Sequence, residues 1–200
     1  MAVQDLRRRL PRAEREEQLL GIATELFADR GFRIPSMDEI ALAAGVTKPV
    51  LYDHFGSKDG LIAACIRRAG EELLVGVAAA VEGAASPEAT FRAGVAAFFD
   101  FVESHGLAWF SLVGDNSVTG PAARAVEEVR QQQADYVAAQ LAEGFPDLSA
   151  ADLAVISEAI IGACERLALW RRDRPEVSPA AARESLTSLL WSGLAARLPA

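Results

Sequence analysis

Residues 36–58, SMDEIALAAGVTKPVLYDHFGSK, contain three helix starts in close succession and constrain the fold more than any other stretch of the chain. Ser36 and Glu39 form a capping-box pattern: the serine oxygen accepts from the Glu39 N–H, and the Glu39 carboxylate accepts from the Ser36 N–H. The helix that begins here is predicted to end after about two turns at Gly45, because glycine readily adopts the left-handed conformation that ends many helices.

A second helix is predicted after the short turn that ends at Thr47, its N-cap. Pro49 fits its first turn, where the missing N–H has no intrahelical partner to lose. Leu51 and Phe55 are four residues apart and form its buried stripe. Two short helices joined by such a turn predict a helix-turn-helix, whose second helix enters the major groove of DNA.

A third helix start follows, with Ser57 as N-cap and Lys58 in the first turn. Free backbone N–H groups and a cation at a helix start suit a phosphate oxygen. Lys48 and Lys58 are the only lysines in the chain, and both fall in this stretch. Four arginines, Arg7, Arg8, Arg9 and Arg12, form a basic N-terminal arm that either lies along DNA or is a solvated tail.

The net charge of −8 is unevenly distributed along the chain. Residues 1–70 hold 11 Lys and Arg against 10 Asp and Glu, whereas residues 71–200 hold 9 against 18. The acidic excess therefore lies outside the predicted DNA-binding part, which is compatible with phosphate binding.

With the helix before it, the segment DEIALAAGVTKPVLYDHFGSKDGL resembles the DNA-binding domain of the TetR family of bacterial transcriptional repressors, over about residues 13–65. The resemblance implies that Lys48, Pro49, Val50 and Tyr52 face the groove. It also implies that Tyr52, His54 and Lys58 reach phosphates. With the two N-caps, the predicted DNA-binding residues are Ser36, Thr47, Lys48, Pro49, Val50, Tyr52, His54 and Lys58. Gly60 departs from the family pattern and predicts a looser first turn after Lys58.

The rest of the chain predicts an all-α protein of about nine helices. Ser86-Pro87 and Ser178-Pro179 are helix-start signals, and Ser104-His105-Gly106 is predicted to end one helix before a short helical segment at 107–113. We expect a DNA-binding helix-turn-helix domain with the basic arm at 1–57, and a larger effector-binding and dimerisation domain at 58–200. Gly70 and Gly76, in the long helix after Lys58, indicate either close helix packing, which we favour, or a bend.

The resemblance implies a small, largely apolar effector that binds in the second domain and releases DNA. The candidate pocket residues, which solid core packing would explain equally well, are Phe98, Trp109, Phe110, Asn116, Tyr136, Cys164, Glu165 and Trp170. The last two predicted helices carry broad apolar bands with small residues such as Gly162 and Gly193, and are the predicted homodimer interface. A two-fold dimer would bind an inverted-repeat operator in double-stranded DNA.

Composition argues against several other classes. The chain has two histidines, no phosphate loop, no Gly-x-Ser-x-Gly elbow and no cluster with metal-ligand spacing, so we expect neither catalysis nor a metal or cofactor. No membrane span or signal peptide is predicted, which favours the cytoplasm. The prediction is a ligand-responsive transcriptional repressor; the alternatives are a DNA-binding architectural protein that senses nothing and, less favoured, an enzyme.

Overall fold

The computed structural model describes residues 10–30, 35–113 and 119–198, without the side chains of Asp29 and of residues 106–113. Every regular element in these ranges is a helix, so the all-α prediction is confirmed. The elements are α1 (Arg12–Arg30), α2 (Met37–Ala43), α3 (Lys48–Phe55), α4 (Lys58–Val81), α5 (Pro87–Val113), α6 (Gly120–Gly144), α7 (Ala150–Arg172) and α8 (Pro179–Ala195). The basic arm before Arg12 lies outside the described residues.

The described ranges contain eight helices where about nine were predicted, because α5 continues through Gly106. The Ser104 hydroxyl donates to the Phe101 carbonyl at 2.9 Å, and the His105 ring stacks on the Phe101 ring at 3.9 Å between centroids. These side chains bond back onto the preceding turn of the same helix and do not end it. One interior glycine costs a helix only about 1 kcal/mol, which the packing of a long helix outweighs.

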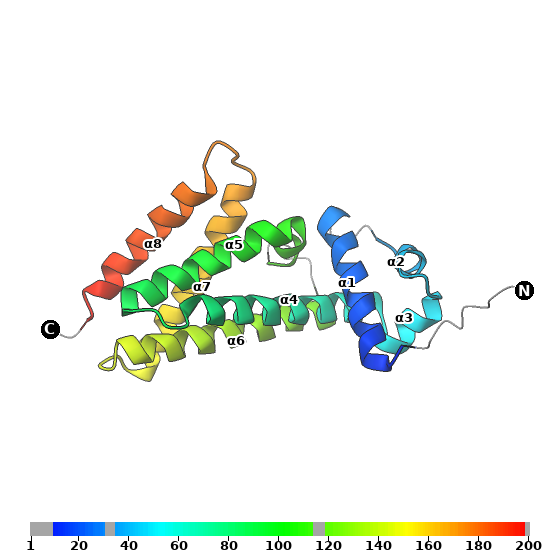
Figure 1. Ribbon diagram of the computed structural model, residues 1–200, viewed down its shortest axis with the longest axis horizontal. Helices are drawn as coiled ribbons and strands as arrows, with labels where there is room; N and C mark the ends of the chain where they lie inside the picture. The colour runs from blue at the N-terminus through cyan, green and yellow to red at the C-terminus, as the bar shows by residue number, and fades with distance from the viewer. Residues whose placement is uncertain (1–9, 31–34, 114–118, 199–200) are drawn as a thin grey trace, which may run out of the picture.

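Helices α1 to α3 form one end of the molecule, and α4 runs from them into a bundle with α5 to α8 (Figure 1). The core of the small end joins all three of its helices to the start of α4. The fully buried side chains there are Leu19, Phe27, Ile40, Leu51 and Leu61. Because α4 belongs to both cores, its position couples the small end to the bundle.

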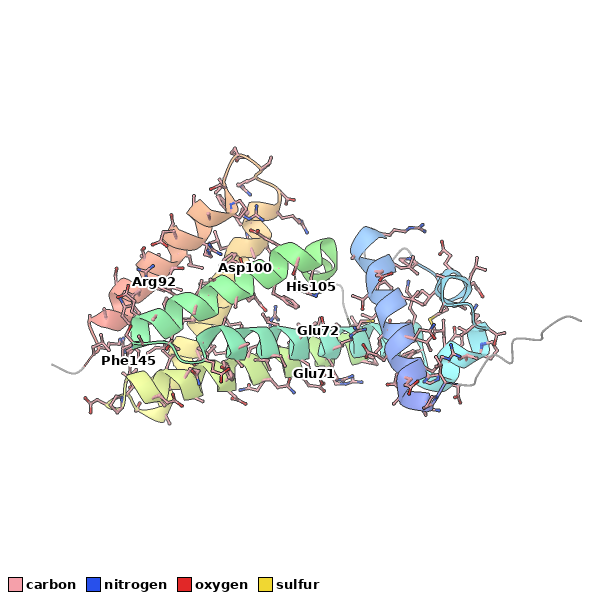
Figure 2. All side chains as sticks on the ribbon, in the orientation of Figure 1. Glu71, Glu72, Arg92, Asp100, His105 and Phe145 are labelled. Carbon is pink, nitrogen blue, oxygen red and sulfur yellow. The ribbon has the colours of Figure 1, made fainter. Side chains whose placement is uncertain are left out.

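Helix α8 is held against α5 by ion pairs as well as by apolar contacts. Arg92 of α5 pairs with Glu184 at 3.1 Å, and Asp100 of α5 pairs with Arg183 at 3.0 Å (Figure 2). Phe91 stacks on Trp191 at 5.9 Å between centroids. The exposed ion pairs contribute little free energy, so the apolar contacts of α8, including this aromatic pair, are the main attachment.

The two interior glycines of α4 have different surroundings. A Cβ on Gly70 would lie 2.7 Å from both methyl carbons of Val129 on α6, which confirms close packing at that position. A Cβ on Gly76 would meet nothing within 4 Å. Packing therefore explains the first glycine and not the second.

These surroundings predict opposite effects of one substitution. We expect Gly70→Ala to lower the free energy of unfolding by about 1–3 kcal/mol, because the new methyl group pushes α4 away from α6. Gly76→Ala is expected to raise it by up to about 1 kcal/mol through helix propensity. Urea denaturation of both variants measures the contrast, and equal effects at the two positions would contradict the packing explanation.

Candidate DNA-binding surface and effector cavity

The start of α2 has the capping geometry that the sequence predicts. The Ser36 oxygen accepts from the Glu39 N–H at 3.2 Å, and the Ser36 N–H donates to the Glu39 carboxylate at 2.8 Å. The hydrogen bonds from Ser36 lower the pKa of the Glu39 carboxyl. The turn to α3 passes through Gly45, whose φ of 63° favours glycine.

Helix α3 begins at Lys48, with Thr47 at the N-cap position. The Thr47 side chain makes no capping hydrogen bond, so the predicted cap is correct in position but not in bonding. The Lys48 ammonium donates to Asp38 of α2 at 2.8 Å, and this hydrogen bond raises the pKa of Lys48. The ammonium has three N–H donors, so Lys48 can contact a phosphate with the donors that Asp38 does not use.

The two faces of α3 differ in exposure as expected for a recognition helix. Leu51 is fully buried, whereas Pro49 is exposed and Tyr52 is 44% exposed. Val50 is half-buried and packs against the core. Pro49 and Tyr52 thus have the exposure that a groove or phosphate contact requires, and Lys48 lies beside them at the helix start.

His54 differs from the prediction that it reaches a phosphate. Its side chain is 7% exposed, and its Nδ1 lies 3.6 Å from the Glu16 carboxylate on α1. The histidine is on the inward side of α3 because it lies three residues after the fully buried Leu51, and its ring is 5.9 Å from that of Phe55 between centroids. At this exposure the side chain lacks the free surface that the predicted phosphate contact requires, and its Nδ1 atom is buried without a hydrogen-bond partner among the described residues.

Asp53 is on the exposed side of α3, where a carboxylate would repel phosphate. Arg12 of α1 pairs with its carboxylate at 3.1 Å and donates to its backbone carbonyl at 3.0 Å. The guanidinium offsets the negative charge and satisfies a carbonyl in the last turn of α3. Arg12 was predicted as part of the basic arm, and the structure places it inside α1 against the recognition helix.

The start of α4 completes this surface. Ser57 is the N-cap: its hydroxyl oxygen accepts from the Gly60 N–H at 2.9 Å. A Cβ on Gly60 would overlap the Phe55 carbonyl oxygen and lie 3.3 Å from the Ser57 hydroxyl. The glycine therefore allows a tight turn, which corrects the predicted loosening. Lys58 is partly buried beside this turn, and burial lowers the pKa of its ammonium.

A cavity of about 320 Å³ lies between α4, α5, α6 and α7. Of the predicted pocket residues, Phe98, Tyr136 and Cys164 line it. Glu165 does not; its carboxylate is buried against the Arg130 guanidinium of α6, with a distance of 3.0 Å from Nη2 to Oε2. Trp170 is 36% exposed and carries the Arg174 guanidinium over its ring, outside the cavity lining.

Three further predicted pocket residues lie outside what the structure describes. Residue 116 has no described position, and the side chains of residues 109 and 110 are not described, so the prediction for Asn116, Trp109 and Phe110 stays untested. Sequence reasoning missed the polar side of the cavity, which α6 supplies through Gln133 and Gln140. Their spacing with Tyr136 at three and four residues is the helical signal that could have found them.

Comparisons with known proteins agree with this geometry. The family described as "Tetracyclin repressor-like, C-terminal domain" matches residues 87–193, and "Bacterial regulatory proteins, tetR family" matches residues 19–65. The HTH-type transcriptional activator FasR of Mycolicibacterium smegmatis is 36% identical over 93% of this chain and 85% of its own length. The chain belongs to the TetR family. It is a DNA-binding transcriptional regulator and not an enzyme.

Other TetR-family relatives match in part or in structure. The repressor KstR2 of Rhodococcus jostii is 32% identical over 45% of this chain and 44% of its own length. A TetR-like regulator from Rhodococcus sp. RHA1 superposes with a TM-score of 0.68 at 37% identity, covering 94% of this chain and 99% of that one. Within the described residues of this TetR-family chain, no helix is long and apolar enough to cross a membrane.

Proposed function

We propose that this regulator is a cytoplasmic homodimeric repressor that binds an inverted-repeat operator and is released by an apolar effector held in the cavity. Residues 1–57 are the DNA-binding unit and residues 58–200 the effector-binding and dimerisation unit. The observation that carries the proposal is that α4 contributes Lys58 to the DNA-facing end and Leu73, Val77 and Val81 to the cavity. A ligand that displaces the cavity wall therefore acts on the helix that holds the recognition helix.

An ion-pair chain provides a second link between the two units. Arg68 of α4 pairs with Glu17 of α1 at 2.9 Å and with Glu72 at 3.0 Å. Glu72 also faces His105 of α5, with 3.3 Å between its carboxylate and Nε2 (Figure 2). A shift of α5 beside the cavity would thus be transmitted to α1 through these ion pairs. Linkage requires that the effector bind the non-DNA-binding conformation more tightly, because equal affinity for both would shift nothing.

The proposed dimer surface is the outer side of α7 and α8. Val155 of α7 and Leu189 of α8 are 69% and 71% exposed, so each of the two helices presents an apolar side chain to solvent. Gly162 and Gly193 are exposed on the same helices, and a Cβ on either would meet nothing within 4 Å. A two-fold axis there would place two recognition helices about 34–36 Å apart, or a multiple of that distance.

Selection of bound sequences from random duplex DNA tests the DNA-binding unit and the dimer together. We expect an enriched inverted repeat. Lys58→Ala is expected to weaken its binding about tenfold and to reduce the salt dependence by about one released ion per protomer. Arg124→Ala on α6 removes the same charge from an exposed position outside both proposed surfaces, and is the control. Enrichment of a single half-site would contradict the proposed dimer. The absence of any enriched sequence at low salt would contradict sequence-specific binding by the DNA-binding unit.

A further inference from the structure

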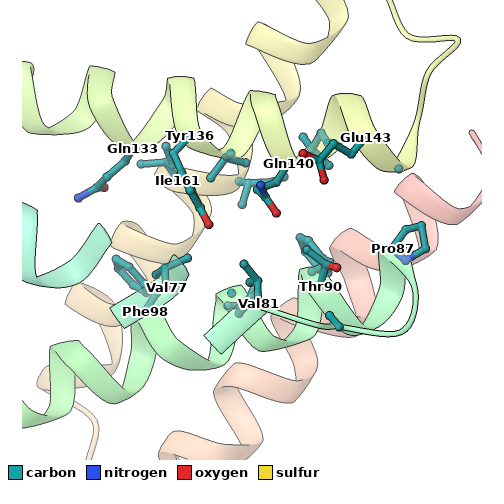
Figure 3. A pocket seen from close by; sticks show the side chains of 18 of the residues that line it. Val77, Val81, Pro87, Thr90, Phe98, Gln133, Tyr136, Gln140, Glu143 and Ile161 are labelled. Carbon is teal, nitrogen blue, oxygen red and sulfur yellow. The ribbon is translucent and has the colours of Figure 1, made fainter. Parts of the chain in front are cut away.

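The cavity has one polar wall and one apolar wall. Helix α6 supplies Gln133, Tyr136, Gln140 and Glu143, whose spacing of three, four and three residues puts them on one face of the helix. Figure 3 shows these side chains extending from α6 toward the helices opposite. Valine and phenylalanine side chains of α4 and α5 form the facing wall, including Val77, Val81 and Phe98. A ligand in this cavity meets hydrocarbon on one side and hydrogen-bonding groups on the other.

Gln133 is the buried member of the polar wall. It is 6% exposed, and its amide nitrogen finds no hydrogen-bond partner among the residues that the structure describes. A buried donor without an acceptor is strongly unfavourable, so such groups are rare in native proteins. An acceptor carried by a ligand in the cavity would satisfy this N–H group.

The charges of the lining restrict what kind of acceptor fits. None of the described lining residues is Lys, Arg or His, and Glu143 contributes a carboxylate at one end. Burial and this neighbouring carboxylate raise the pKa of the Tyr136 hydroxyl, while burial raises the pKa of the Cys164 thiol to about 12, so both remain neutral. A carboxylate or phosphate enclosed here would be an unpaired buried anion.

The cavity also has a defined extent along α6. Gln133 and Glu143 are about 15 Å apart along the helix at 1.5 Å per residue. Beyond Glu143, a Cβ on Gly144 would lie 3.1 Å from Pro87, so the start of α5 packs closely against this end of α6. The cavity, whose end at Glu143 is exposed to solvent, therefore suits an elongated molecule of moderate length.

We propose that the cavity binds an uncharged, mainly aliphatic molecule whose hydroxyl, ester or ketone oxygen accepts a hydrogen bond from the Gln133 amide. This inference rests on the effector role proposed above and specifies the chemistry of the effector. The Gln133 donor favours a ligand that carries a hydrogen-bond acceptor. An enclosed anion is unfavourable because the described lining has no basic residue. The apolar side chains of α4 and α5 contact the hydrocarbon part of the ligand.

Four ligands with the same chain length test the inference by calorimetric titration of the full protein: decanol, methyl decanoate, decanoate and decylamine. We expect the two neutral compounds to bind at least about tenfold more tightly than decanoate. Decylamine can pair with the Glu143 carboxylate but offers Gln133 no acceptor, so loss of the Gln133 donor should not weaken its binding. Gln133→Met keeps a similar side-chain volume without the donor, and is expected to weaken methyl decanoate binding about tenfold. Gln132→Met, the same change at the exposed neighbouring position, is the control and should keep wild-type affinity.

A second readout needs no ligand. Gln133→Met should raise the thermal unfolding midpoint of the unliganded protein, because the unsatisfied buried donor is removed, whereas Gln132→Met should leave it unchanged. Decanoate binding as tightly as decanol, or a Gln133→Met variant with wild-type affinity for methyl decanoate, would overturn the inference and leave the cavity as an effector site. If no compound bound or altered operator affinity, both the inference and the effector role of the cavity would be contradicted.

Discussion

A Gly60→Ala variant is expected to lose more than about tenfold in operator affinity and about 3 kcal/mol in the free energy of unfolding of the DNA-binding end. The added methyl group would overlap the Phe55 carbonyl oxygen at the end of α3. That carbonyl already accepts from the Ser57 N–H at 2.8 Å, so it has little freedom to move. Relief of the overlap must separate α3 from the start of α4.

The loss of affinity follows from this separation. The Ser57 hydroxyl bond to the Gly60 N–H is broken or lengthened, and Lys58 moves relative to the exposed face of α3. Lys58 and Tyr52, both proposed to contact phosphates, can then no longer reach the DNA backbone at the same time. Gel-shift titration against the selected operator, with urea denaturation of the free protein, measures both effects.

Gly76→Ala is the matched control, since it makes the same change in the same helix where no atom is within 4 Å. It should leave operator affinity unchanged. Wild-type affinity and stability in Gly60→Ala would refute the requirement for glycine at this turn.

The local signals in the sequence were sufficient to predict the DNA-binding end. Capping at Ser36, the left-handed turn at Gly45 and the burial of Leu51 are all confirmed, because each depends on residues within one helix or turn. The constraint on Gly60 was not predictable in this way. It arises from the direction of the Phe55 carbonyl, which only the folded turn between α3 and α4 defines.

The cavity was less predictable for the same physical reason. Residues 131–133 are three consecutive glutamines, yet only Gln133 is buried. Periodicity assigns them to different faces of α6 but does not say which face meets a cavity. Glu165 illustrates the converse, since its position on α7 suggested a pocket carboxylate until its partner on α6 was known.

Arg130 of α6 is the partner of Glu165. We expect Arg130→Met to lower the free energy of unfolding by about 3 kcal/mol near neutral pH. Glu165 is 8% exposed, and its carboxylate accepts from the Arg130 Nε at 3.1 Å and from Nη2 at 3.0 Å. Removal of the guanidinium leaves a buried carboxylate without this counterion. The value is at the lower end of the range for buried pairs, because the Arg130 side chain is 34% exposed.

The pH dependence identifies the cause. Burial raises the pKa of Glu165 above its ordinary value of 4.5, while Arg130 opposes this shift, so the substitution raises the folded-state pKa further. Protonated Glu165 carries no uncompensated charge. The destabilisation by Arg130→Met should therefore be smallest below the unfolded-state pKa and grow as pH rises through the folded-state pKa.

Urea denaturation of wild type and variant across this range measures the difference in unfolding free energy at each pH. In a Glu165→Gln background no carboxyl titrates at this position, so the effect of adding Arg130→Met to Glu165→Gln should lose the pH dependence seen with Arg130→Met alone. A destabilisation equal at all pH values would attribute the loss to packing of the arginine stem and not to Glu165. Ile161, one turn before Glu165, and Cys164, directly before it, line the cavity, so the Arg130–Glu165 pair also holds the part of α7 that an effector would contact.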